Sequence, residues 1–383
     1  MKRSYIAKRF QSSGAGLSLD TEALAKYKDI IDLSIGDTDF TTDESIINAA
    51  FRDARAGHTH YGDPKGDPEL IDAVCRAWEE DFGQRLPRDH VLVSASSCLG
   101  MALVMLAILD PGDEVIVFSP YFPMYREQIE LAGGVCVDVP TYASEDYAID
   151  EARLRAAITP RTKAIVFNNP TNPTGMGYDG KTLELLARVA QEHDLLIAAD
   201  EIYTTYLYEG DFRPIRTLPG MAERTITLNS FSKNFLMTGW RVGVIIAEPE
   251  LLAVMNRING SLIYSAPSVS QRAAIQALAM RKKIREKYVT AYRDRIFYSA
   301  DRIEKVPYLS LVRPKGTFYL FPGVEKTGLD EKAFCKVLLD QAHVLVSPGT
   351  PFGVSAAGHF RIACTVGIDR LKAAFDRMEK LSF

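Results

Sequence analysis

One lysine stands out as a residue that could do covalent chemistry. Lys233 ends the Ser-Phe-Ser-Lys run at 230–233, and Arg241 adds a fixed positive charge eight residues later. A lysine amine forms Schiff bases with carbonyl compounds when a hydrophobic or cationic setting lowers its pKa. A lysine taken alone is usually an ordinary surface residue. The two serines and the Gly-Trp-Arg-Val-Gly run at 239–243 favour the functional interpretation.

A carboxylate follows directly on an apolar run, because Asp200 closes the stretch 195–199. A carboxylate at the end of a buried strand is costly unless it is paired. It could serve as a helix cap or as an ion-pair partner. In the functional interpretation, Asp200 keeps the ring nitrogen of a pyridine cofactor protonated, which makes that ring an electron sink. Tyr203 stands three residues later, within reach of the same ring.

Two further motifs have polar groups at fixed spacing. The Asn-Asn-Pro-Thr-Asn-Pro-Thr-Gly run at 168–175 predicts a rigid turn, and its Asn172 amide could donate to the phenolic oxygen of such a cofactor. Ser96, Ser97 and Cys98 stand between a β-branched run and an apolar helix. Free amides at a helix N-terminus, together with hydroxyls, form an anion site, and a simple serine N-cap is the alternative.

All four motifs stand next to short apolar runs that alternate with helical spacing. Such runs are typical of strands buried on both faces, so we predict an α/β domain with a largely parallel sheet. Ligands bind at the carboxyl ends of the strands in sheets of this kind. The predicted strands are 91–95, 115–118, 164–167, 195–199, 225–228 and 242–247, and the predicted helices are 99–109 and 182–193.

The end of the chain has a different pattern, which predicts a smaller α+β lobe. The chain has 383 residues, more than the roughly 250–300 that one core organises. We predict an N-terminal arm over 1–35 that packs on the small lobe, a large cofactor-binding domain over 36–275 and a small C-terminal domain over 276–383. In the tail we expect helices at 268–305, 332–341 and 369–380, and strands at 309–312, 317–320, 344–346 and 360–364.

Composition excludes several classes of protein. With 45 Lys+Arg against 49 Asp+Glu, the net charge of −4 argues against a nucleic-acid binder. Five scattered cysteines argue against a disulfide scaffold and fit a reducing, cytoplasmic setting. No apolar stretch approaches the about 20 residues that span a membrane. The basic start of the chain resembles a transit peptide only weakly. His58, His60 and Asp63 could be a metal site, but a His-x-His turn is usually solvated, so we expect no metal.

Taken in their order, these motifs resemble those of the class I/II aminotransferases, which are fold-type-I enzymes of pyridoxal 5′-phosphate (PLP). The resemblance covers about residues 31–381 and rests on the runs at 169–175, 200–203 and 230–243. It implies a large domain with a mostly parallel sheet flanked by helices and a smaller α+β lobe. It also implies transfer of an amino group from an L-amino acid to a 2-oxo acid, by a ping-pong mechanism through an aldimine on Lys233.

The resemblance further implies roles for single residues. Lys233 would also move the Cα proton, Asp200 would pair with the pyridine nitrogen, and Asn172 and Tyr203 would contact the phenolic oxygen. The ring of Phe122 would stack on the cofactor. The phosphate would be held by Ser97, Cys98, Ser230, Ser232 and Arg241, and by Tyr61 of a neighbouring subunit, which implies a homodimer. The substrate would be bound by Gly36, Asn172 and Arg361.

Other reactions remain open at the level of sequence. The Asp-Thr-Asp-Phe run at 37–40 is also similar to that of the carbon–sulfur β-lyases of the same superfamily, so a PLP-dependent β-lyase is an alternative. A non-catalytic PLP-binding regulator is a third possibility, disfavoured because about 30 residues cannot hold a DNA-binding module. No second arginine is assigned to a distal substrate carboxylate. We expect side-chain selectivity to depend on residues near Ile35, Tyr125 and Tyr264.

Overall fold

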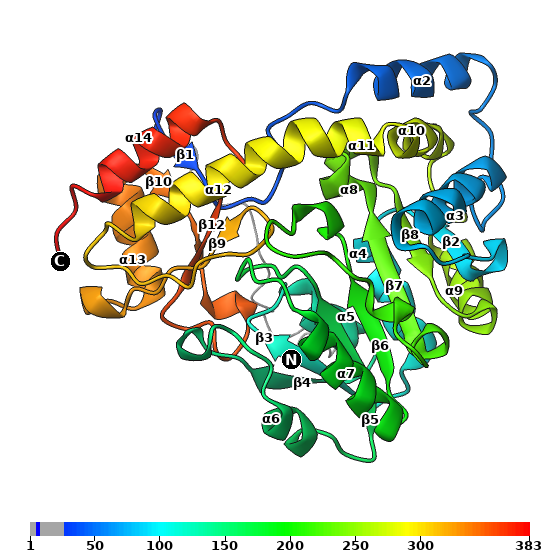
Figure 1. The fold of residues 1–383 in the computed structure, drawn as a ribbon, viewed down its shortest axis with the longest axis horizontal. Coiled ribbons are helices and arrows are strands. Elements are labelled where there is room, and N and C mark those ends of the chain that lie inside the picture. The colour runs from blue at the N-terminus through cyan, green and yellow to red at the C-terminus, as the bar shows by residue number, and fades with distance from the viewer. Residues whose placement is uncertain (1–4, 8–26) are drawn as a thin grey trace.

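A twisted seven-stranded sheet forms the centre of the chain. The computed structural model describes residues 5–7 and 27–383. The strand order is β2-β8-β7-β6-β5-β3-β4, and only β8 runs against its neighbours, so the predicted α/β fold with a mostly parallel sheet is confirmed (Figure 1). The strands are β2 (Val91–Ser94), β3 (Glu114–Ser119), β4 (Val135–Pro140), β5 (Thr162–Asn168), β6 (Leu196–Asp200), β7 (Thr225–Ser230) and β8 (Gly243–Ile246).

Helices cover both faces of this sheet, which explains why its strands are continuous apolar runs. On one face α4 (Ser97–Ile108), α5 (Met124–Leu131) and α9 (Pro249–Leu262) bury their apolar side chains against the strands. On the other face lie α6 (Glu151–Ala156) and α7 (Gly180–Glu192). The predicted elements are present with shifted ends. The edge strand β4 was not predicted, because most of its residues are only half-buried and break the apolar pattern.

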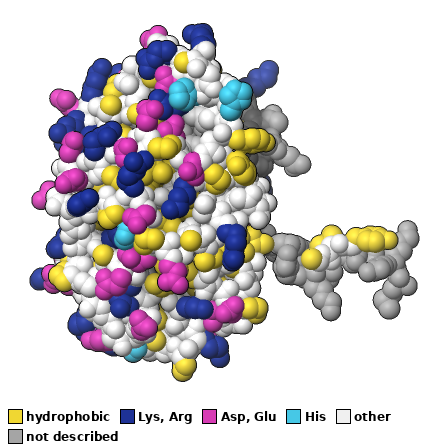
Figure 2. All heavy atoms as spheres, turned by 90° about the vertical axis from the view of Figure 1, so that its right-hand side faces the viewer, with side chains coloured by type: hydrophobic (Ala, Val, Ile, Leu, Met, Phe, Trp, Pro, Cys, Tyr) yellow, Lys and Arg dark blue, Asp and Glu magenta, His cyan; other side chains and the backbone are white. Residues whose placement is uncertain are grey.

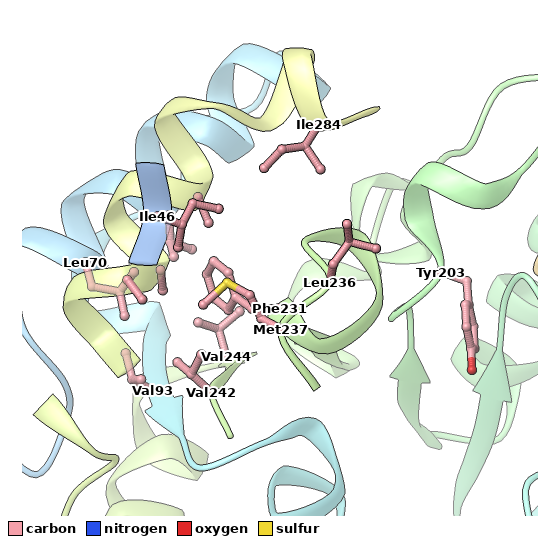
Figure 3. Close-up of a cluster of buried hydrophobic side chains, with 14 of the residues drawn as sticks. Ile46, Leu70, Val93, Tyr203, Phe231, Leu236, Met237, Val242, Val244 and Ile284 are labelled. Atoms are coloured by element: carbon pink, nitrogen blue, oxygen red, sulfur yellow. The ribbon is translucent and has the colours of Figure 1, made fainter. Parts of the chain in front are cut away.

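Three more helices cover strands β2 and β8 on the face of the sheet opposite α4, because Val93 and Val244 of these strands belong to a separate apolar cluster. Helices α2 (Glu44–Arg55), α3 (Pro68–Phe82) and α10 (Ser268–Ala279) enclose a cluster of apolar side chains (Figure 3). Arg272 of α10 ties these helices together, because its guanidinium pairs with Asp53, Asp67 and Glu69. On the face shown in Figure 2, Lys and Arg side chains are interspersed with Asp and Glu.

The predicted helix over 268–305 is interrupted rather than continuous. After α10 the chain turns at Met280, continues as α11 (Arg281–Ile284), widens into a π-helical turn (Arg285–Val289) and resumes as α12 (Thr290–Ile303). Helix α12 extends from the side of α10 and α11 to the C-terminal lobe (Figure 1). A π-helical turn accommodates one extra residue per turn, and the helical spacing of the sequence does not register this local change.

The C-terminal part has its own core. Strand β1 (Ile31–Asp32) pairs in parallel with β10 (Val344–Leu345), and β9 (Tyr319–Leu320), β12 (Phe360–Ala363) and β11 (Ser347–Pro348) form a small antiparallel sheet. Helices α12, α13 (Glu331–Val337) and α14 (Ile368–Met378) pack on these strands. The predicted strand over 309–312 is wrong. Only Ser310 forms a bridge there, since Pro314 and the positive φ of Thr317 (58°) bend the chain.

The three-part division of the chain stays a prediction. Ile31 and Leu33 are buried in the C-terminal core, which supports an arm that packs on the small lobe. Most of the predicted arm, and with it the basic segment at residues 2–9 except 5–7, lies outside the described residues. Among the helices of the described ranges, none has the length and apolarity needed to cross a membrane.

Candidate active site

The polar motifs predicted at strand ends come together at one edge of the central sheet. Asn168 at the end of β5 is in register with Asp200 at the end of β6, and Asp200 is in register with Leu228 on β7. The Asn168 side chain donates to the backbone carbonyl of Asp200 at 2.9 Å and accepts from the backbone N–H of Asn172 at 2.8 Å. Asn168 therefore joins the two motifs, a role that the sequence analysis did not assign to it.

Lys233 lies on α8 (Phe231–Asn234), the short helix that follows β7. Its neighbours Phe231, Leu236 and Met237 are buried against the apolar cluster of Figure 3, which anchors the turn that carries the lysine. The Lys233 Nζ donates to the Gly36 carbonyl. Burial lowers the pKa of Lys233 to about 8, an effect that the Asp37 carboxylate opposes and the Arg361 and Arg241 guanidinium groups reinforce. An amine with this pKa is available as a nucleophile near neutral pH.

Asp200 is a buried carboxylate with one oxygen paired and one oxygen unpaired. Its Oδ2 accepts a hydrogen bond from the Tyr125 hydroxyl at 2.5 Å. Its Oδ1 has no hydrogen-bond partner among the residues that the structure describes. Burial raises the pKa of Asp200 to about 6, while the Tyr125 hydroxyl opposes the rise. A buried acceptor without a donor is costly, and a protonated ring nitrogen of PLP would satisfy it.

Arg361 on β12 is a buried cation without a carboxylate partner in the described part of the chain. Its Nη1 donates to Asn172 Oδ1 at 3.1 Å and its Nη2 to the Ser34 carbonyl at 2.6 Å, while Nε has no partner in the same ranges. Its guanidinium carbon lies 4.7 Å from the ring centre of Tyr319 and 5.0 Å from that of Phe352. Burial lowers the pKa of Arg361. This arrangement favours a carboxylate ligand.

Tyr319 is a site residue that the sequence analysis missed. Its hydroxyl lies 3.0 Å from that of Tyr203, and its ring stacks under Arg361. A Cβ at Gly36 would fall 1.8 Å from the Tyr319 hydroxyl oxygen, so only glycine fits there. The signal available in the sequence was weak, since Tyr319 is one aromatic residue in the apolar run at 317–321.

The residues predicted to hold a phosphate line a backbone cradle between β8 and α4. Ser97 and Cys98 are the first residues of α4, where backbone amides lack partners within the helix. A Cβ on Gly243 would come within 2.8 Å of the Ser97 nitrogen, so this approach requires glycine. Ser96 (φ 150°) and Arg241 (φ 53°) have positive φ values, which are rare outside glycine and often mark functional sites.

The serines of the Ser-Phe-Ser-Lys run lie next to this cradle in the sheet. The Ser230 hydroxyl donates to Ser232 Oγ at 2.9 Å, and Ser230 pairs with Gly243 across the β7–β8 ladder. Arg241 is exposed and donates to the Thr238 carbonyl at 2.9 Å. Its charge lowers the pKa of Lys233. Amides at a helix start, two hydroxyls and a guanidinium fit a phosphate dianion, and with Asp200 and Lys233 they fit PLP.

Two predicted aromatic residues, Phe122 and Tyr61, each contact another aromatic ring. Phe122 is half-buried just before α5, and its ring meets that of Tyr125 edge-on at 5.7 Å between centroids. Tyr61 is 87% exposed, and its ring centroid lies 5.1 Å from that of Tyr264. No contact of Tyr61 with Lys233 is among the interactions of the described residues. The expectation that side-chain selectivity depends on residues near Ile35, Tyr125 and Tyr264 stays a prediction, and the structure gives Tyr125 a further contact. Its side chain is buried, and its hydroxyl is bonded to Asp200.

The comparisons with known proteins agree with this geometry. The family described as aminotransferase class I and II matches residues 28–378. The arginine–pyruvate transaminase of Pseudomonas aeruginosa is 35% identical over 99% of this chain and 97% of its own length. The aspartate/prephenate aminotransferase of Thermus thermophilus is 38% identical over 92% of this chain and 91% of its own.

Solved structures give the same result. The aspartate aminotransferase from Thermus thermophilus with maleate superposes with a TM-score of 0.93 at 35% identity, covering 99% of this chain and 100% of that one. Within residues 5–7 and 27–383, no group of three or more His, Cys, Asp or Glu side chains could hold a metal ion. The relatives are named transaminases, which favours this reaction over the carbon–sulfur lyase and the regulator. The chain belongs to the class I and II aminotransferases, the fold-type-I transaminases that use pyridoxal phosphate.

Proposed function

We propose that Lys233, Asp200 and Arg361 have separate roles in the transamination. Lys233 moves the proton, Asp200 binds the cofactor and Arg361 binds the substrate. The observation that supports this most strongly is the contrast between Asp200 and Arg361. Asp200 Oδ1 is a buried acceptor without a donor, and Arg361 is a buried cation without a carboxylate, in the part of the chain that the structure describes. Lys233 contacts Gly36 and is influenced by the charge of Arg361. A cofactor with a protonated ring nitrogen and a substrate with a carboxylate would satisfy both groups.

The chain offers a partner for each polar part of PLP. Asp200 Oδ1 would accept from the ring nitrogen, Asn172 and Tyr203 would contact the phenolic oxygen, and Phe122 would cover one face of the ring. The phosphate would be held by Ser97, Cys98, Ser230, Ser232 and Arg241. When bound, PLP supplies the electron sink for the negative charge that develops at the substrate Cα.

The substrate would be bound through its α-carboxylate. The planar guanidinium of Arg361 suits a bidentate contact with it, and Asn172 Oδ1 holds that guanidinium in place. Gly36 leaves room for the substrate where a side chain would clash with Tyr319. Lys233 Nζ would take the proton from the substrate Cα and deliver it to the cofactor carbon that receives the amino nitrogen, and it would move a proton in the opposite direction in the second half-reaction. A general base of this kind works best when its pKa lies near the working pH.

The names of relatives indicate which donors to test first. Relatives are named for arginine, aspartate and aromatic amino acids. We propose that the donor is one of these classes of L-amino acid and the acceptor a 2-oxo acid. We also propose that the protein works in the cytoplasm, which localisation of a tagged full-length chain would test.

The roles of the lysine can be tested directly. The PLP-loaded chain should show visible absorbance that changes when the correct donor is added, and Lys233→Ala should abolish turnover and covalent attachment of PLP after borohydride reduction. Lys163→Ala is the control, because Lys163 is half-exposed and pairs with Asp113. Full turnover by the Lys233→Ala chain would refute the assignment.

Tyr61 fits a homodimer in which it completes the phosphate site of the other chain. Its exposure, and that of Tyr264 and Leu262, supports this arrangement. Tyr61→Phe should weaken PLP affinity about tenfold, whereas Tyr142→Phe, at another exposed tyrosine, should not. Mixing Tyr61→Phe with Lys233→Ala chains should restore activity, because a mixed dimer contains one native site. A fully active monomer in light scattering would exclude the proposal.

A further inference from the structure

Tyr125 contacts two of the side chains that the proposed cofactor site needs. It lies on α5, in the first turn after the β3 end, and its side chain is buried. Its hydroxyl donates to Asp200 Oδ2 at 2.5 Å. Its ring meets Phe122 at 5.7 Å between centroids, with an interplanar angle of 78°. One residue therefore holds both the carboxylate and the aromatic ring on which the cofactor would stack.

The direction of the hydrogen bond is fixed by the surroundings. Burial and the nearby Asp200 carboxylate raise the pKa of the Tyr125 phenol well above its ordinary value, so the phenol keeps its proton and donates. Oδ2 is thereby occupied, and Oδ1 is left as the acceptor without a partner in the described ranges. The other titratable groups whose charges interact with Asp200 are Tyr203, Glu201 and Cys98, and none of them has a hydrogen bond to this carboxylate among the contacts of the described residues.

We propose that Tyr125 is a positioning residue, which orients the Asp200 carboxylate and stabilises its charged form so that Oδ1 meets the ring nitrogen of PLP. This inference rests on the proposed role of Asp200. The hydroxyl acts through Asp200 and touches neither the substrate nor the reacting atoms. If the Tyr125 hydroxyl is removed, the Asp200 carboxylate loses its only side-chain donor in the described structure and can rotate about the Cβ–Cγ bond. The charged form would then be less stable, and it would be lost at a higher pH.

The test compares Tyr125→Phe with Tyr121→Phe. Tyr121 lies in the same segment and is also buried, but its hydroxyl accepts from Arg126 Nε at 2.9 Å instead of contacting Asp200. The readout is the equilibrium affinity of the full-length apo chain for PLP between pH 5 and 9, followed by visible absorbance. Tyr125→Phe should weaken this affinity about tenfold at pH 8. The pH below which the affinity falls, called here the acid fall-off, should rise by about one pH unit. Tyr121→Phe should keep the native fall-off.

A double-mutant cycle separates a local effect from loss of folding. In an Asp200→Ala background the hydroxyl has no carboxylate to orient, so adding Tyr125→Phe should change PLP affinity less than twofold. Equal effects of Tyr125→Phe in both backgrounds, or an unshifted acid fall-off, would overturn the positioning role. A native chain that binds no PLP would instead overturn the proposed function. Circular dichroism of each variant confirms that the compared chains are folded.

Discussion

Arg361 Nη1 lies 3.1 Å from Asn172 Oδ1, although the two residues are 189 positions apart in the sequence. Asn172 belongs to the turn after β5 in the large sheet, and Arg361 belongs to β12 in the small antiparallel sheet. The contact therefore joins the two sheets at the proposed substrate site. It also orients a buried guanidinium whose charge no carboxylate in the described ranges neutralises.

Arg361→Lys should raise the KM for the amino donor about 100-fold. The ammonium of lysine keeps the positive charge but cannot form the planar two-point contact with a carboxylate. The loss of one or two charge-assisted hydrogen bonds corresponds to about 2–3 kcal/mol. Steady-state kinetics with saturating 2-oxo acid measure this change. Arg313→Lys is the control because Arg313 is exposed and pairs with Asp301 and Glu304 away from the proposed site. An unchanged KM would show that the carboxylate binds elsewhere.

The rate of PLP capture by the apo chain should depend on the charge of Lys233. Only the neutral amine attacks an aldehyde, and burial brings the pKa of this amine down to about 8. Because the folded pKa is lowered, the neutral fraction rises through pH 8, levels off above it and falls about tenfold per pH unit below it. Stopped-flow absorbance between pH 6 and 10 measures the rate. A midpoint near 10, as for a lysine in water, would contradict the electrostatic account.

Gly243→Ala should weaken PLP binding about tenfold or more. The new Cβ would come within 2.9 Å of three backbone atoms, those of Ser97, Asn229 and Ser96, and backbone cannot move aside cheaply. The start of α4 would shift, and with it the amides proposed to bind the phosphate. Gly239→Ala is the matched control from the same segment, because a Cβ there would meet nothing within 4 Å. Titration of both apo variants with PLP distinguishes the two outcomes.

The sequence predicted the positions of the motifs at strand ends well, because each of these strands is an apolar run followed by polar residues. Asp200 and Lys233 could be placed at one sheet edge on that ground alone. The contact of Tyr125 with Asp200 could not be predicted, because it joins residues 75 positions apart whose spacing has no period. Tyr319 was missed for the same reason, since its role depends on how the small sheet meets the large domain.

Glu201 is the second buried carboxyl group of this strand end, and it has no assigned part in the reaction. Its Oε1 accepts from the Ile215 amide at 3.2 Å. Burial is the main cause that raises its pKa to about 8, the Ile215 amide opposes the rise, and the Asp200 carboxylate adds to it. A folded pKa above the ordinary value of 4.5 means that the folded chain resists ionisation between pH 4.5 and 8. Glu201 therefore lowers the free energy of unfolding increasingly over this range.

Glu201→Gln should consequently stabilise the apo chain at alkaline pH. Glutamine keeps the acceptor for Ile215 and removes the ionisable proton, so the gain should be on the order of 5 kcal/mol at pH 9 and should disappear near pH 4. Urea unfolding at a series of pH values measures it. Glu184→Gln, at an exposed position of α7, is the control and should change little. A gain that does not depend on pH would mean that packing, and not ionisation, accounts for the effect of Glu201.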